Sequence, residues 1–152
     1  MKLNRVLILL CASLTLSNIV CAEAPASKTV VIIAYDTMKY SVTKIEAQPG
    51  EKIVVELKSE GNMPKEVMGH NWVLLKAGVD PLGYCAAALS AKEEGYMPKT
   101  MAGKVLASIP LLGPKESGKA TFTAPTVPGS YAYVCSFPGH SQAGMLGALI
   151  VK

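Results

Sequence analysis

A series of short apolar or alternating segments, separated by glycine and proline, constrains the fold of this chain most strongly. Segments of this kind predict β-strands, and they lie at residues 29–35, 41–47, 52–58, 71–76, 105–109, 120–123, 130–135 and 146–151. In the third segment, Ile53, Val55 and Leu57 lie on one side, as a half-buried strand requires. Many short strands predict an all-β protein, and we expect a Greek-key β-sandwich built of antiparallel strands.

One segment departs from the strand pattern and predicts a short inserted helix. Asp80 and Pro81 are typical of an N-cap and a first helical position, and Gly95 supplies a stop. Four residues at helical spacing form its expected apolar face: Leu82, Cys85, Ala86 and Leu89. The Cys85 thiol is therefore expected to be buried and inert.

The first 22 residues have the pattern of a secretory signal. A basic start precedes an apolar run, and Val20 and Ala22 suit a signal peptidase that cuts after Ala22. We therefore divide the chain into a signal peptide at residues 1–22 and one domain at residues 23–152, located in the periplasm or otherwise exported. A membrane anchor is disfavoured because polar residues interrupt the apolar run. Lipoprotein anchoring through Cys21 is disfavoured because Val20 is bulkier than that processing normally accepts.

Charge and hydropathy then limit the partners of the mature chain. Without Lys2 and Arg5, the 15 basic residues become 13, against 11 acidic ones, which leaves a net charge of +2. So small a charge argues against binding to nucleic acid, which needs clustered cations. Since no later segment is long and apolar enough to span a bilayer, we expect a soluble product with no membrane span.

Cysteine usage leaves one alternative open. Of the four cysteines, Cys11 and Cys21 lie in the signal, so the mature chain keeps only Cys85 and Cys135. In an exported protein, two cysteines can form a disulfide. Such a bridge would occupy the only thiol available for the site described next.

The end of the chain carries the residues with the most specific chemistry. Cys135, His140 and Met145 follow one another with four residues in each interval, and glycine and proline between them allow tight turns. The other histidine, His70, begins a predicted strand. Two histidines, one cysteine and a weakly bound methionine make the ligand set of blue-copper electron transfer. Zinc is the rival metal, but its structural sites prefer a fourth cysteine, histidine or carboxylate to a thioether.

These motifs resemble the azurin and plastocyanin family of blue-copper proteins. The resemblance lies in Met-Gly-His-Asn-Trp at 68–72, the run Ser-Ile-Pro-Leu-Leu-Gly-Pro-Lys-Glu-Ser-Gly-Lys at 108–119, and Cys-Ser-Phe-Pro-Gly-His at 135–140. It implies a cupredoxin-like sandwich with one type 1 copper, His70, Cys135 and His140 as equatorial ligands, and Met145 as the axial ligand.

The same resemblance assigns the residues around the ligands. It implies a distant contact from the Gly69 carbonyl, amide donors to the Cys135 sulfur from Asn71 and Phe137, and a tie between the two ligand loops through Asn71 and Ser136. One departure bears on this assignment: four residues separate His140 from Met145, where azurin has three, which puts the Gly69 contact in question. The chain also has no cysteine pair for azurin's disulfide near the N-terminus.

By this resemblance the protein is expected to be an electron carrier, not an enzyme, that serves redox proteins such as c-type cytochromes, oxidases or reductases. Electrons would leave through His140, surrounded by an apolar docking patch of Met68, Phe137, Pro138 and Ala143, with Met63 and Pro64 as additions. Ordinary packing around a metal would produce the same apolar residues. A copper carrier or store could share the ligands, whereas an oxidase or reductase would need further histidines, and both are used.

Overall fold

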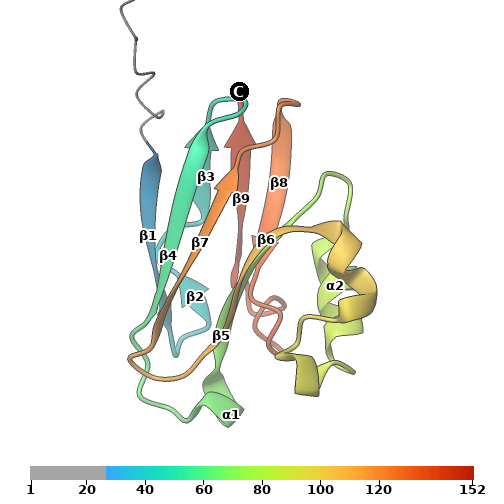
Figure 1. Ribbon diagram of the computed structural model, residues 1–152. Coiled ribbons are helices and arrows are strands. Elements are labelled where there is room, and N and C mark those ends of the chain that lie inside the picture. Colours follow the sequence, from blue (N-terminus) through green and yellow to red (C-terminus); the bar gives the residue numbers. More distant parts are fainter. Residues whose placement is uncertain (1–26) are drawn as a thin grey trace, which may run out of the picture.

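The computed structural model describes residues 27–152, so the predicted signal peptide lies outside the described residues. Nine strands form the framework of this part of the chain (Figure 1). They are β1 (Lys28–Tyr35), β2 (Lys39–Tyr40), β3 (Lys44–Ala47), β4 (Lys52–Ser59), β5 (His70–Leu75), β6 (Val105–Leu112), β7 (Ser117–Thr123), β8 (Gly129–Val134) and β9 (Leu146–Val151). The predicted strands are all present, with ends that differ by a few residues.

The strands form two sheets that face each other as a β-sandwich (Figure 1). One sheet has the order β2-β1-β4-β7, and the other has the order β3-β9-β8-β5-β6. The expectation of antiparallel strands throughout was wrong, because β1 pairs with β4 and β3 pairs with β9 in parallel. After the β1–β2 turn, the chain continues through β3 in the other sheet, and the next turn sends β4 back in the direction of β1.

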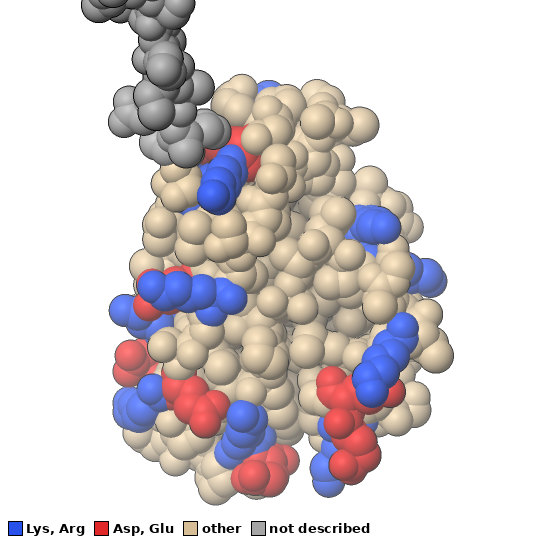
Figure 2. Space-filling view, viewed as in Figure 1, with Lys and Arg blue, Asp and Glu red and all other residues tan. Residues whose placement is uncertain are grey.

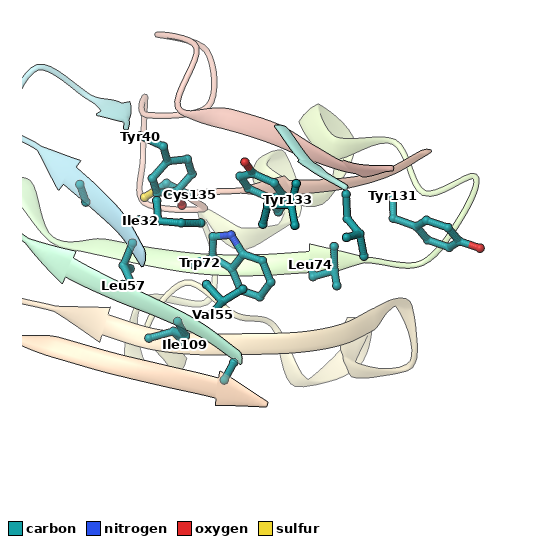
Figure 3. Packing of buried hydrophobic residues seen from close by; sticks show 14 of the residues in the cluster. Ile32, Tyr40, Val55, Leu57, Trp72, Leu74, Ile109, Tyr131, Tyr133 and Cys135 are labelled. Carbon is teal, nitrogen blue, oxygen red and sulfur yellow. The ribbon is translucent and has the colours of Figure 1, made fainter. Parts of the chain in front are cut away.

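The core lies between the two sheets and follows the strand alternation. Ile53, Val55 and Leu57 of β4 are fully buried, as the sequence pattern predicted. In Figure 3, Trp72 lies at the centre of the cluster, and its ring centroid is 5.5 Å from that of Tyr133. Cys135 belongs to the same buried cluster and is fully enclosed. The predicted thiol ligand is therefore held by the main core of the protein.

The predicted helix is present as α2 (Pro81–Ala88), with the Asp80 side chain accepting from the amides of Leu82 and Gly83. Its predicted face was wrong in part. Leu82 and Leu89 are about half exposed and Ala86 is exposed as well, whereas the buried residues are Tyr84, Cys85 and Ala88. Tyr84 packs against β5 and β8, because it clusters with Val73 and Val134.

Three further helical segments were not predicted. They are the single turn α1 (Lys65–Met68) and the 3-10 segments η1 (Lys92–Glu94) and η2 (Lys99–Lys104). Gly95 is left-handed, as a helix stop requires, but it ends η1 and not α2. The predicted helix α2 ends earlier, at Ala88. No helix within residues 27–152 is long and apolar enough to cross a membrane.

The loops that carry the candidate ligands lie at the end of the sandwich away from the chain terminus (Figure 1). On the face drawn in Figure 2, basic and acidic side chains lie next to one another, and no single sign of charge dominates. The described residues also form several surface ion pairs, such as Lys65 with Glu116 at 3.2 Å.

Candidate metal centre

Two strands and one loop bring the predicted ligands to the same end of the five-stranded sheet. His70 is the first residue of β5, and Cys135 directly follows β8. His140 and Met145 lie in the connection from β8 to β9, where the Met145 amide donates to the His140 carbonyl (2.9 Å) and the Cys135 amide donates to the Met145 carbonyl (3.1 Å). These bonds fold the loop back on itself, so that its three candidate ligands converge.

The donor atoms of His70, Cys135 and His140 all lie within 4.8 Å of one another. The Cys135 sulfur is 3.4 Å from His140 Nδ1, and the two imidazole centroids are 5.0 Å apart. Among the described residues, neither ring nitrogen of His70 has a hydrogen-bond partner, although the side chain is fully buried. Buried polar atoms normally have partners. An imidazole without one, beside a second imidazole and a thiol, fits a soft metal such as copper.

The role of Met145 as the axial ligand stays a prediction. Met145 is fully buried and belongs to the same core cluster as Cys135. Gly69 lies directly before His70 and is packed too tightly for a side chain, because an added Cβ would lie 2.6 Å from the Lys65 carbonyl oxygen and 2.9 Å from Leu111. The role of the Gly69 carbonyl as a metal contact stays a prediction.

Asn71 and Ser136 join the two ligand-bearing segments, as the resemblance implied. The Ser136 amide donates to Asn71 Oδ1 (2.8 Å), and Asn71 Nδ2 donates to Ser136 Oγ (2.8 Å) and to the Gly95 carbonyl (3.2 Å). Both side chains are fully buried. Asn71 directly follows His70, and Ser136 directly follows Cys135. The hydrogen bonds between Asn71 and Ser136 therefore fix the distance between the two candidate ligands.

Burial sets the protonation of the site before any metal is bound. It raises the pKa of Cys135 to about 12, and the backbone amides of Asn71 and Phe137 oppose this rise by donating toward the sulfur. Burial also lowers the pKa of His140 to about 4, with a smaller contribution from His70, whose own pKa is lowered mainly by burial. The copper-free site therefore holds a neutral thiol and two neutral imidazoles at pH 7.

The two cysteines do not form a disulfide. Both are free, and the Cys85 thiol donates to the Cys135 carbonyl at 3.8 Å. Cys85 is buried, as predicted, and burial raises its pKa. The Cys135 sulfur thus remains available as a ligand.

The predicted docking patch is partly exposed. Met68, Pro138 and Ala143 are half-buried and Met63 is exposed, but Phe137 is only 7 % exposed. The Phe137 ring packs between His140 and Tyr96, with centroid distances of 4.7 Å and 5.0 Å. Phe137 therefore packs inside the site and contributes little to the exposed surface.

Comparison with known proteins decides the family. The chain matches the family of copper binding proteins described as the plastocyanin/azurin family over residues 27–152. The protein belongs to this family. Copper is its cofactor, and the arrangement of two histidines and one cysteine suits one copper site.

Individual members of the plastocyanin/azurin family support this assignment. The chain is 35% identical to azurin of Pseudomonas denitrificans over 130 residues, which cover 84% of this chain and all of that protein. It is 33% identical to auracyanin-B of Chloroflexus aurantiacus over 136 residues, covering 89% of this chain but only 56% of that protein. Dithionite-reduced auracyanin of Roseiflexus castenholzii aligns with a TM-score of 0.74 at 29% identity, covering 84% of this chain and 98% of that one.

Two contacts to the site and one exposed apolar residue were not predicted from the sequence. The Tyr40 hydroxyl donates to the Asn71 carbonyl, and the Ser136 hydroxyl donates to the Tyr96 carbonyl. Val67, on the exposed side of α1, is 55% exposed beside the predicted patch. In the sequence, Val67 lies between the charged Glu66 and the predicted patch residue Met68. No local pattern signalled the tyrosines, because both hydrogen bonds join residues distant in sequence.

Proposed function

We propose that the protein carries single electrons between redox proteins through a type 1 copper. The observation that carries the proposal is the buried convergence of two imidazoles and one thiol within 4.8 Å in a chain of the plastocyanin/azurin family. His70, Cys135 and His140 are the proposed equatorial ligands and Met145 is the proposed axial one. Copper held there supplies one-electron chemistry between Cu(II) and Cu(I).

The protein itself holds these four side chains in fixed positions and excludes water from them. Their exposed fractions are 0% for three and 2% for His140, which keeps water from adding as a ligand. The Asn71–Ser136 hydrogen bonds fix the two loops to each other. A ligand set that suits both oxidation states and cannot relax needs little reorganisation, which favours fast electron transfer.

His140 is the proposed exit for electrons, because it is the least enclosed of the four. Met68, Pro138 and Ala143 present apolar surface around it, and exposed apolar patches mark docking sites. The proposed partners are exported redox proteins, such as c-type cytochromes, oxidases or reductases. Export itself rests on the signal pattern of residues 1–22, and the mass of the protein recovered from the periplasm would test a cut after Ala22.

The central experiment is copper titration of the purified protein, followed by absorption spectroscopy and voltammetry. We expect one copper per chain, an intense visible band from the thiolate, and a reversible one-electron couple. Cys135→Ser should abolish the band, whereas Cys85→Ser, which changes the only other described thiol, should keep it. A colourless copper-loaded wild type would reject the proposed site.

A copper carrier or store is the second candidate, because it could use the same ligands. The two functions differ in what is exchanged. An electron carrier should cycle between its oxidation states while its copper stays bound against a chelator in both. If Cu(I) is lost to the chelator on the time scale of reduction, the function as a copper carrier or store is favoured.

A further inference from the structure

A carboxylate lies beside the Nε2 edge of the His70 ring. Asp36 Oδ1 is 4.0 Å from His70 Nε2, and the Asp36 side chain is 30% exposed whereas the imidazole is fully buried. Nε2 has no hydrogen-bond partner among the described residues. A separation of 4.0 Å is an electrostatic contact rather than a hydrogen bond, so any effect of Asp36 on the ring comes from its charge.

The position of this carboxylate is fixed by the loop that faces it. Asp36 Oδ2 accepts from the Asn62 amide at 2.9 Å. The other oxygen lies over Gly61, where an added Cβ would come within 2.0 Å of it. The Glu60 amide in turn donates to the Ala34 carbonyl of β1 at 2.9 Å, which holds the loop against the strand that precedes Asp36. A charge placed in this way cannot turn freely toward solvent.

The contact distinguishes the two nitrogens of the His70 ring. The nitrogens lie on different sides of an imidazole, so the ring can present only one of them to a carboxylate and the other to a metal. With Nε2 facing Asp36, Nδ1 is left for the site, which is also the nitrogen that His140 presents to the Cys135 sulfur. Carboxylates that face the far nitrogen of a ligating histidine fix its tautomer and increase its basicity.

We infer that Asp36 is a positioning residue for His70: its carboxylate keeps the proton on Nε2, keeps Nδ1 free for copper, and stabilises the more positively charged oxidised state. The inference rests on the proposed copper site. The part that concerns the tautomer of His70 can be tested without copper.

Three variants separate the position of the carboxylate from its charge. Asp36→Asn removes the charge and keeps the shape. Gly61→Ala keeps the charge but pushes the carboxylate away from its place over the loop. Glu60→Gln is the matched control, because it removes one charge from the same loop, where Glu60 is paired with Lys115 at 3.3 Å and not with the histidine.

The first measurement is ¹⁵N NMR of the copper-free protein, which reports which nitrogen of His70 carries the proton. We expect one tautomer with the proton on Nε2 in the wild type and in Glu60→Gln, and a mixture in Asp36→Asn and Gly61→Ala. A wild-type proton on Nδ1, or a tautomer that Asp36→Asn leaves unchanged, would overturn the inference. Because this measurement needs no metal, it stands even if copper binding itself fails.

The second measurement is the reduction potential of the copper-loaded protein at high ionic strength, which screens general surface charge. We expect Asp36→Asn to shift the equilibrium toward the reduced state about tenfold, or about 59 mV upward. Cu(II) binding should weaken by about 10-fold to 100-fold, the usual effect of losing such a partner. Gly61→Ala should change both quantities in the same direction, and Glu60→Gln should change them little. Equal shifts in Asp36→Asn and Glu60→Gln would show a general charge effect and overturn the inference.

Discussion

Replacing Asn71 with alanine tests whether the link between the two ligand loops stabilises the fold as well as the site. The side chain makes three hydrogen bonds, two with Ser136 and one with the Gly95 carbonyl, and it is fully buried. At about 1 kcal/mol for each bond, plus a penalty for the groups left unpaired, the free energy of unfolding should fall by about 3–5 kcal/mol. A typical domain has only about 5–15 kcal/mol in total.

The assay is urea unfolding of the copper-free protein, because bound copper would add its own stabilisation to the native state. With a slope of about 1–3 kcal/mol per molar urea, a loss of about 3 kcal/mol moves the midpoint by roughly 1–3 M. Asn62→Ala is the control: its side chain is exposed, so its effect should be within about 0.5 kcal/mol.

Combination with Ser136→Ala shows whether the two residues act together. The double variant should be less destabilised than the two single effects predict, by about 1 kcal/mol or more, since both single changes break the same bonds. Strict additivity, or a midpoint for Asn71→Ala that matches Asn62→Ala, would refute the view that this pair holds the loops together.

Four further predictions follow from the same structure. Gly69→Ala should destabilise the protein by about 1–3 kcal/mol because its Cβ meets the Lys65 carbonyl; Gly103→Ala, where the added Cβ has open space, is its control in the same unfolding assay. The copper-free protein should lose stability as pH falls from 6.5 toward about 4, because the unfolded chain protonates His140 at its ordinary pKa while the folded chain does not; an unfolding free energy that is flat over this range would contradict it. Ala143→Lys should slow electron self-exchange, whereas Val127→Lys, an exposed position outside the patch, should not; equal rates in stopped-flow would remove the proposed exit face. Met145→Leu should raise the reduction potential and Met145→Gln should lower it, and voltammetry that finds both shifts in the same direction would remove Met145 from the ligand set.

The sequence predicted the strands well because their side-chain period is local. Ile53, Val55 and Leu57 occupy every second position of a segment that begins and ends with lysine, and this pattern places them in the core. Strand direction is a different kind of information, since the parallel pairing of β1 with β4 depends on where the intervening chain crosses between sheets. The helix face was mistaken for a similar reason: Leu82 and Tyr84 are both apolar, and only the shape of the neighbouring strands decides which of them is buried.

Three of the four candidate ligands were identifiable because unusual residue types occur at short, regular intervals from Cys135 to Met145. His70 was identified because the chain has only two histidines and because it lies in the Met-Gly-His-Asn-Trp motif at 68–72. The residues around the ligands are harder to predict. Asp36 reaches the site from a turn 34 residues before His70, and a lone aspartate in a turn has the same local pattern whether or not it faces a histidine.

Burial and metal binding are opposed at Cys135, and the surrounding hydrogen bonds reconcile them. A fully enclosed thiol is difficult to ionise, as its pKa of about 12 indicates, yet a metal binds the thiolate. The amides of Asn71 and Phe137 donate toward the sulfur and make the charged form less costly, but they do not offset burial. The thiol must therefore lose its proton when copper binds, so copper binding near neutral pH should release about one proton from the thiol.

The same enclosure keeps the neutral ligands in place before copper binds, because Cys135 is packed as a core residue and needs no metal to hold it. Rigidity at this site is thus a property of the sandwich, and the metal enters a position that the fold has already formed.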